Sequence, residues 1–379
     1  MKVAVILEAV FPENKGGLER WYSHLSHELA KNVETVDYLN STGINREKEN
    51  LRYINVTNHQ WGYLDGGVRS IKQAIQFLFA LIKWMWRHNY DFIYLSSVPI
   101  ISIFVIPIIR IKNPKTVIVV EWLEYWPYRY WRSYKKNILG TISWLIQLIA
   151  LQFGTYRTTF IRRTYNTVKS RNVPWLKRRT LLLPGLVNDN LVVENSENIT
   201  RNDIVLVGRL VEEKQPLLAI SIIEKYIDLG WSGTFWIIGT GPEEQKIRKL
   251  LGGSKFQNQI ELLVNASDAQ IEEKYKSSFL LLHPSKREGY GLVCVEAAFK
   301  GLPALLINYP DNGAVDLGIN PELVSSTDKV EEILGLIQYT KMNFSLESLK
   351  SLSWAQESMY QKTVSKSVME ILRIANRNV

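Results

Sequence analysis

The sequence has few of the features that mark secreted, hydrolytic or membrane-spanning proteins. Its 379 residues include a single cysteine, Cys294, so no internal disulfide can form, and we expect a reducing, cytoplasmic compartment. Met1-Lys2 leads directly into VAVILE, which is too short for the apolar core of a signal peptide. Neither a G-x-S-x-G elbow nor a G-x-x-x-x-G-K-S/T loop occurs. Hydrolase and nucleoside-triphosphatase functions therefore lose most of their support.

The usual ligands of a protein-bound divalent cation are also missing. No Asp-x-Asp pair is present to hold the metal of a nucleotide complex. The histidines show no zinc-binding spacing; they are His24, His27, His59, His88 and His283. We therefore expect neither a metal site nor a cofactor.

The composition is that of a globular protein, with 46% hydrophobic and 22% charged residues. A chain of this length exceeds one ordinary core, so two domains are expected. Residues 1–185 hold 26 Lys and Arg against 12 Asp and Glu, whereas residues 186–379 hold 20 against 25. The basic first half also carries nine of the twelve tryptophans. It suggests an anionic membrane or a nucleic acid as partner, against the alternative of a solvated basic face.

Short apolar strands alternate with helical segments along most of the chain, which predicts parallel sheets with crossover helices, an α/β fold. Residues 33–66 are poorly patterned, and a polar linker is expected over 188–202. Ser267 and Gln270 predict a capping box for a helix over 268–276. Beyond Ser353 and Trp354, one amphipathic helix is expected to run toward Asn378. The predicted strands include residues 2–7, 91–96, 116–120, 203–207, 234–238 and 260–264.

Residues 281–303, LLHPSKREGYGLVCVEAAFKGLP, combine a strand, a glycine loop and a helix. Gly301 stands where a left-handed helix cap is expected. Glycines allow backbone N–H groups to approach a ligand at the positive end of a helix dipole, which suits a phosphate. Glu288 and Glu296 are two further acceptors that suit sugar hydroxyls, although two solvated glutamates are the plainer alternative. The combination predicts a sugar-nucleotide site.

Two other segments place residues that can bind phosphate next to a predicted strand. Arg209 and Lys214 follow the predicted strand 203–207, where α/β sheets bind ligands, and their charges can stabilise a leaving diphosphate. Near the start of the chain, Gly16 and Gly17 end a loop between a strand and a helix. That loop suits a phosphate, but a plain tight turn remains open.

Together these segments resemble the motifs of the retaining glycosyltransferases of family 4, which have the two-domain, Rossmann-like GT-B architecture. The resemblance lies in EGYGLVCVEA from Glu288, in G-R-L-x-x-x-K from Gly208 and in GG-x-ER from Gly16. It implies that Glu288 contacts the donor sugar and that Glu296 holds the nucleotide ribose. It further implies that Arg209 and Lys214 hold the diphosphate and that a loop amide at Gly16 and Gly17 approaches this diphosphate. Amides that contact the sugar and phosphate are implied at Gly289, Tyr290, Gly291 and Leu292.

The sequence departs from the family at one position. Many relatives carry a histidine that faces the donor sugar at the end of a first-domain strand, but Glu121-Trp122-Leu123-Glu124 occupies that region here. The role of the family histidine is left unassigned.

We thus predict an acceptor-side domain over 1–185, with a terminal helix over about 356–379 packing back on it, and a donor-binding domain over 186–355. The predicted activity is that of a metal-independent, anomer-retaining hexosyltransferase, with Glu288, Arg209 and Lys214 as its catalytic residues. The expected partners are a nucleotide-diphospho-sugar and a glycan or lipid-linked acceptor, and no nucleic acid. A GT-B sugar-nucleotide epimerase and a basic nucleic-acid-binding protein are the alternatives.

Residues 139–153, LGTISWLIQLIALQF, are apolar nearly all round but shorter than the about 20 residues of a membrane span. Either this is a buried core helix, or it is a surface that dips into lipid beside anionic head groups. We expect the second, at the cytoplasmic face of a membrane. Bases follow the stretch at Arg157, Arg162, Arg163, Lys169, Arg171, Lys177, Arg178 and Arg179.

Overall fold

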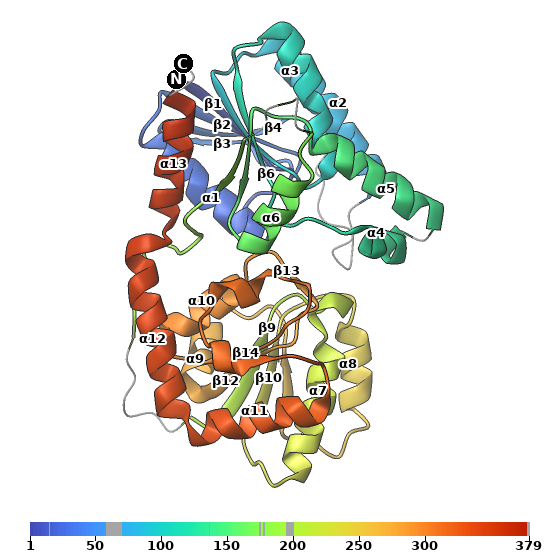
Figure 1. The fold of residues 1–379 in the computed structure, drawn as a ribbon, viewed down its shortest axis with the longest axis vertical. Coiled ribbons are helices and arrows are strands. Elements are labelled where there is room, and N and C mark those ends of the chain that lie inside the picture. The colour runs from blue at the N-terminus through green and yellow to red at the C-terminus, as the bar shows by residue number, and fades with distance from the viewer. Residues whose placement is uncertain are drawn as a thin grey trace. The chain divides into compact units, whose positions relative to one another are not determined.

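A computed structural model describes residues 1–14, 16–57, 70–135, 137–173, 176, 179–194 and 201–376. His59, Lys177 and Arg178 of the sequence-based predictions lie outside the described residues, as do Asn378 and part of the linker over 188–202. The chain forms two compact units: unit 1 comprises Met1–Asp189 and Lys362–Val379, and unit 2 comprises Asn190–Gln361 (Figure 1).

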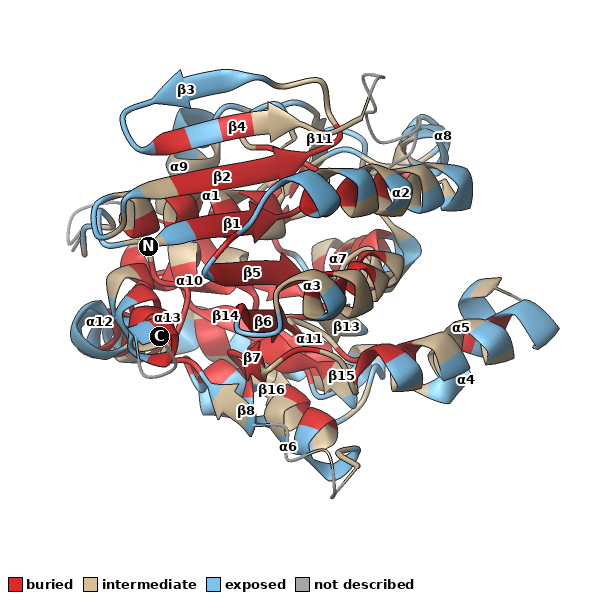
Figure 2. Ribbon diagram, turned by 90° about the horizontal axis from the view of Figure 1, so that it is seen from above, coloured by how far each residue is buried: buried red, intermediate tan, exposed pale blue. Residues whose placement is uncertain are grey.

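Unit 1 is built on a sheet of eight strands in the order β3-β4-β2-β1-β5-β6-β7-β8. All neighbouring pairs are parallel except β3 with β4. Figure 2 shows the central strands β1 and β5 buried and the edge strand β3 exposed. The strands are β1 (Lys2–Ile6), β2 (Thr35–Asn40), β3 (Arg46–Lys48), β4 (Leu51–Asn55), β5 (Phe92–Ser96), β6 (Val117–Glu121), β7 (Tyr156–Thr159) and β8 (Arg179–Leu182).

Helices cover this sheet, and several of them contribute apolar side chains to one core cluster with the strands. Phe77 and Leu81 from a helix, for example, pack with Ile93 and Ile118 from the strands. The helices are α1 (Gly17–Ala30), α2 (Ile71–Arg87), the 3-10 helix η1 (Ile100–Val105), α3 (Ile106–Lys112), α4 (Tyr128–Lys135), α5 (Asn137–Ala150), α6 (Arg162–Ser170) and α13 (Val364–Asn376).

The poorly patterned region 33–66 contains three strands, β2, β3 and β4. Strand β2 holds a polar side chain inside the fold: Asp37 is buried and accepts two hydrogen bonds from Arg52, at 2.7 and 3.0 Å, and one from Tyr90 at 2.7 Å. Such partners satisfy a buried carboxylate. Because they come from β4 and from Tyr90, two residues before β5, the short-range pattern gives no sign of them.

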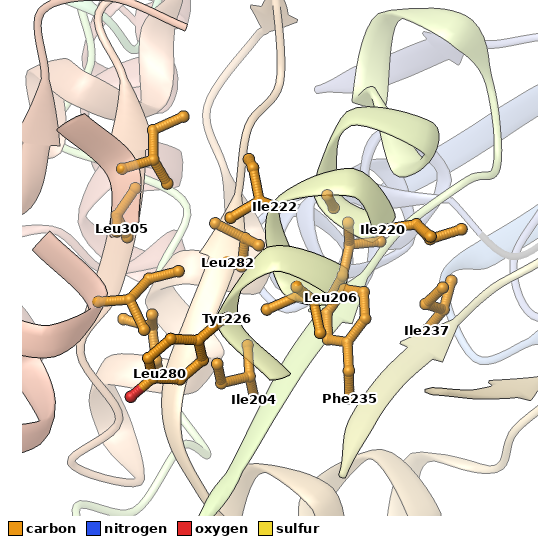
Figure 3. Packing of buried hydrophobic residues seen from close by; sticks show 14 of the residues in the cluster. Ile204, Leu206, Ile220, Ile222, Tyr226, Phe235, Ile237, Leu280, Leu282 and Leu305 are labelled. Atoms are coloured by element: carbon orange, nitrogen blue, oxygen red, sulfur yellow. The ribbon is translucent and has the colours of Figure 1, made fainter. Parts of the chain in front are cut away.

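Unit 2 has a six-stranded parallel sheet in the order β11-β10-β9-β12-β14-β16, and β13 pairs with β15 beside it. Figure 3 shows Ile204, Leu206 and Leu280 of the sheet packed with Ile220 and Tyr226 of the helix that follows β9. The strands are β9 (Asp203–Val207), β10 (Phe235–Ile238), β11 (Ile260–Leu263), β12 (Ser278–His283), β13 (Arg287–Glu288), β14 (Ala304–Ile307), β15 (Asp311–Asn312) and β16 (Val324–Ser325). The helices are η3 (Glu212–Lys214), α7 (Pro216–Asp228), α8 (Glu244–Leu251), α9 (Asp268–Ser277), α10 (Leu292–Phe299), η4 (Gly313–Leu317), η5 (Pro321–Leu323), α11 (Val330–Met342) and α12 (Phe344–Gln361).

Two local predictions for unit 2 are confirmed. Ser267 and Gln270 form the reciprocal capping box at the start of α9. Gly301 has a φ of +62° after α10, the left-handed conformation that favours glycine at a helix end.

The end of the chain differs from the expected single helix. Helix α12 ends at Gln361, and α13 begins at Val364. Between them Val187 N donates to Lys362 O at 3.0 Å and Val364 N donates to Val187 O at 2.8 Å, so the chain is held to unit 1 there. The units accordingly divide after Asp189 and after Gln361, rather than after 185 and 355.

Candidate functional site

The sheet of unit 2 reverses its winding direction between β9 and β12. From β9 the chain proceeds outward to β10 and β11, and from β12 it proceeds to β14 and β16 on the other side. In such sheets, ligands bind at the carboxyl ends of the strands that flank the reversal. The two loops at this point are residues 208–215 after β9 and residues 284–291 after β12.

Hydrogen bonds and an ion pair connect these two loops. Lys286 N donates to Glu213 O at 2.8 Å, and Ser285 Oγ donates to the same oxygen at 3.4 Å. The ammonium of Lys214 pairs with the carboxylate of Glu288. Both side chains are largely buried, at 18% and 17% exposure. The structure thus brings together two of the predicted catalytic residues at the reversal point.

The charge of Glu288 is set by its neighbours. Burial raises the pKa of a carboxyl group, but here the Lys214 ammonium outweighs it, and the pKa of Glu288 is lowered well below its usual range. Burial lowers the pKa of His283, the Glu288 carboxylate opposes that, and the net pKa is below the ordinary value. At neutral pH the site therefore contains an ionised Glu288 and an uncharged His283.

Arg209 follows directly after β9 and Gly208 and is exposed. Three glycines shape the loops at the ends of β9 and β10. Gly208, Gly239 and Gly241 have φ values of +153°, +154° and +156°, and a Cβ at Gly239 would collide with the carbonyl of Gly208. Only glycine permits this backbone approach, which places the loop after β10 against the chain leading to Arg209.

Residues 289–292 form the turn into α10. Gly289 and Tyr290 are buried, and Gly291 is the helix N-cap with a φ of +92°. A Cβ on Gly291 would come within 2.6 Å of the Ala314 side chain. Leu292 is the first residue of α10, and half-buried Glu296 lies in its second turn. The predicted contacts from Glu288 to Glu296 therefore occupy one strand, one turn and one helix.

The remaining predicted contacts, Gly16 and Gly17, belong to unit 1. Gly16 is the N-cap of α1 and Gly17 is its first residue. A Cβ at Gly16 would collide with the carboxylate of Glu19, which is buried at the start of the helix. The glycine thus makes room for an acidic side chain in the first helical turn, where the helix dipole favours negative charge.

Glu121 ends β6 in the region where the family carries a histidine. Its Oε2 accepts hydrogen bonds from the Trp21 indole and the Tyr94 hydroxyl, both at 2.6 Å. Its Oε1 is buried and has no hydrogen-bond partner among the described residues. Burial raises the pKa of Glu121 to about 7, although the two hydrogen bonds oppose the rise.

Sequence reasoning missed one residue of this arrangement. His283 ends β12 and its Nε2 lies 3.2 Å from Glu288 Oε2, although the ring is not aligned for a hydrogen bond. The signal was its place at the carboxyl end of a buried strand that leads into the glycine loop, not a spacing between histidines.

Within the ranges that the structure describes, no three His, Cys, Asp or Glu side chains converge as they would around a metal ion. Among the same residues, no helix combines the length and the apolar character needed to cross a bilayer.

Comparison with known proteins relates part of this chain to a family. Residues 188–328 match the model of the glycosyl transferases group 1. The chain is 29% identical over 145 residues to the GtfA subunit of the UDP-N-acetylglucosamine–peptide N-acetylglucosaminyltransferase of Streptococcus pneumoniae, covering 37% of this chain and 28% of that one. It is 28% identical over 128 residues to the alpha-monoglucosyldiacylglycerol synthase of Acholeplasma laidlawii, covering 33% and 30%. The matches thus span less than a third of these two relatives.

Solved structures match over nearly the whole chain. The sucrose-phosphate synthase of Thermosynechococcus elongatus superposes with a TM-score of 0.80 at 14% identity, covering 99% of this chain and 98% of that one. WaaG, a glycosyltransferase involved in lipopolysaccharide biosynthesis, gives 0.71 at 15% identity, covering 98% and 99%. The predicted α/β GT-B fold is confirmed. The chain thus has the GT-B fold, and most of its second unit is similar to the glycosyl transferases group 1.

Proposed function

We propose that the protein is an anomer-retaining glycosyltransferase of family 4 that moves a hexose from a nucleotide-diphospho-sugar to an acceptor. One observation carries the proposal. The ion pair of Lys214 and Glu288 joins the loops after β9 and β12, at the reversal point of the unit 2 sheet, and Arg209 lies in the same loop after β9. Cations beside a fixed carboxylate suit a donor with an anionic diphosphate and a hydroxylated sugar.

The proposed chemistry is a front-face substitution. The bond between the sugar C1 and the diphosphate oxygen breaks, and the acceptor oxygen bonds to C1 on the same face. The acceptor proton passes to the leaving phosphate. Arg209 and Lys214 stabilise the negative charge on the departing diphosphate, while Glu288 binds the sugar and Glu296 the ribose. Positioned charges of this kind act most strongly where charge develops in the transition state.

We further propose that the reaction needs no divalent metal, since Arg209, Lys214 and the N-terminus of α10 supply positive charge for the phosphates. The acceptor is a glycan or a lipid-linked molecule held by unit 1, and the enzyme works at the cytoplasmic face of a membrane. Two relatives support a lipid or glycan acceptor by their names, the alpha-monoglucosyldiacylglycerol synthase and WaaG. The relatives named here give no support to an epimerase or to a nucleic-acid-binding protein.

A thermal-shift screen of the full chain with nucleotide-diphospho-sugars of different bases and sugars tests the proposal. A ligand of the folded state at 100 times its Kd stabilises it by about 2.7 kcal/mol. We expect one donor to raise the Tm, and the same donor to be consumed when acceptors are added, with retention at C1 visible by NMR.

Arg209→Ala should reduce the Tm shift caused by that donor, because the diphosphate loses a partner. Arg248→Ala is the matched control, since Arg248 is an exposed arginine of the same unit that pairs with Glu244 on its own helix. The proposal fails if no donor stabilises the protein and none is consumed, or if both variants respond to the donor like the wild type.

A further inference from the structure

Helix α5 presents an apolar stripe to solvent. Ile138, Ile142, Leu145 and Ile149 are 75%, 46%, 47% and 54% exposed. Their spacing of four, three and four residues puts them on one face of the helix, and Leu139, at 60%, lies beside them. A helix of a soluble domain ordinarily turns such a stripe toward the core. The outward face of α5 is therefore built for an apolar surrounding.

The opposite face of α5 is fixed by polar contacts with α4 and with the residues just before it. Gln147 is 1% exposed; it accepts a hydrogen bond from the Trp131 indole at 3.2 Å and donates one to Trp126 O at 2.8 Å. Trp144 donates to the Tyr125 hydroxyl at 3.2 Å. A Cβ at Gly140 would collide with the backbone of α4, so glycine permits close packing of the two helices. Because these contacts hold the polar face inward, the orientation of the stripe is set by the fold.

The sequence from this hairpin onward is basic, and the nearest carboxylate before it, Glu124, accepts a hydrogen bond from the Trp126 indole at 2.9 Å. Residues 125–188 contain twelve Lys and Arg and no Asp or Glu. Arg129 and Arg132 are exposed on α4, beside the exposed aromatic side chains of Tyr128 and Tyr134. Tyrosines with bases next to an apolar helix face are typical of segments that lie in the interface of a bilayer.

We infer that the α4–α5 hairpin docks unit 1 on an anionic lipid surface, with the α5 stripe in the outer acyl region and the bases of the hairpin at the head groups. From Ile138 to Ile149 the stripe rises about 16 Å at 1.5 Å per residue. It is too short to span the about 30 Å hydrocarbon layer, so α5 lies in the plane of the membrane. This inference concerns unit 1 alone and does not rest on the donor chemistry of unit 2.

Two other occupants fit the surface less well. A second copy of the chain would bring two hairpins together, each with exposed bases and without a carboxylate between residues 125 and 188 to pair them. A nucleic acid would match the bases but would leave the apolar stripe in water. Anionic lipid would pair with the basic side chains and would also cover the apolar stripe.

The test is co-sedimentation of the full chain, without any donor, with vesicles of phosphatidylcholine alone or mixed with phosphatidylglycerol. We expect binding to the anionic vesicles that weakens as salt is raised. Ile142→Ser with Leu145→Ser should weaken binding by roughly 10-fold or more, because two buried apolar side chains are lost. Arg129→Gln with Arg132→Gln should weaken it by a similar factor and flatten the salt dependence.

Matched controls come from unit 2. Leu346→Ser with Leu349→Ser replaces two exposed leucines of α12, and Lys225→Gln with Lys255→Gln removes two exposed charges. We expect both controls to bind within about twofold of the wild type, since surface substitutions change little elsewhere. Thermal unfolding of each variant establishes that it is folded.

Three results of the vesicle assay would overturn the inference: no binding to anionic vesicles at low salt, equal binding to neutral vesicles, or wild-type binding by both hairpin variants. A fourth would be a dimer that dissociates in the Ile142→Ser, Leu145→Ser variant while no vesicle binding is seen. The last result would assign the stripe to a second copy. Because no donor is added, failure here is separate from failure of the proposed glycosyl transfer.

Discussion

Lys214 and Glu288 form an ion pair across the two loops that flank the winding reversal in unit 2. Each side chain is largely buried, so the charge of one depends on the presence of the other. Breaking such a pair from one side leaves an uncompensated charge, which costs more than the loss of an exposed contact.

Lys214→Ala should therefore affect both stability and turnover, whereas Arg209→Ala should affect turnover alone. We expect either change to lower kcat by roughly 10²-fold or more, because each removes a charge that stabilises the leaving diphosphate. Only Lys214→Ala should lower the Tm as well, since Arg209 is exposed. Single-turnover transfer and thermal unfolding check this. Turnover within a few-fold of wild type in both variants would remove the two residues from the site.

The two carboxylates of the glycine-loop unit should have different effects. Glu288→Ala should impair sugar transfer more than it impairs binding of the free nucleoside diphosphate, because its proposed partner is the sugar. Glu296→Ala, half-buried on α10, should weaken binding of the nucleoside diphosphate as well. Isothermal titration with the nucleoside diphosphate and a transfer assay separate the two effects. Unchanged nucleotide affinity together with unchanged activity in both variants would contradict the assignment.

The parts of the fold that depend on local patterns could be predicted from the sequence. The apolar runs that become β1 and β12 are buried, and the Ser267–Gln270 box caps α9 as expected. These features follow from residues within a few positions of one another, so a reading of periodicity and caps finds them.

The parts of the fold that depend on partners distant in the sequence could not be predicted. Strand β2 was not predicted because the buried Asp37 accepts its hydrogen bonds from Arg52 and Tyr90, which are 15 and 53 residues away. The sequence left α5 open between a buried helix and a lipid-facing one, because apolar residues occur nearly all round it. The buried contacts of Gln147 with α4 decide which face is inward, and they exist only in the folded hairpin.

Transfer activity should persist in excess EDTA. The proposed cations at the diphosphate are Arg209 and Lys214, and neither is removed by a chelator. We expect the initial rate with EDTA to lie within about twofold of the rate without it, because the protein's own cations stabilise the leaving diphosphate. Loss of activity that magnesium or manganese restores would reveal a metal requirement and contradict the prediction.

Glu121 should make the stability of the protein depend on pH in a defined window. Its pKa is raised by burial from 4.5 to about 7. Between these values the folded state binds a proton at Glu121 that the unfolded state has released, so stability falls as pH rises through this window and levels off above it. Each pKa unit corresponds to about 1.4 kcal/mol, so the cost of the ionised carboxylate at pH 8 is on the order of 3 kcal/mol.

Glu121→Gln removes this titration and keeps a group that can accept from Trp21 and Tyr94. The difference in Tm between variant and wild type should therefore grow in favour of the variant from pH 4.5 to 7 and then stay constant. Glu47→Gln, on the exposed edge strand β3, is the matched control for the replacement of a carboxylate by an amide. Thermal unfolding across this pH range measures both. A difference for Glu121→Gln that does not change with pH would mean that Glu121 binds its proton equally in the folded and unfolded states, because only a change in proton binding on unfolding makes stability vary with pH.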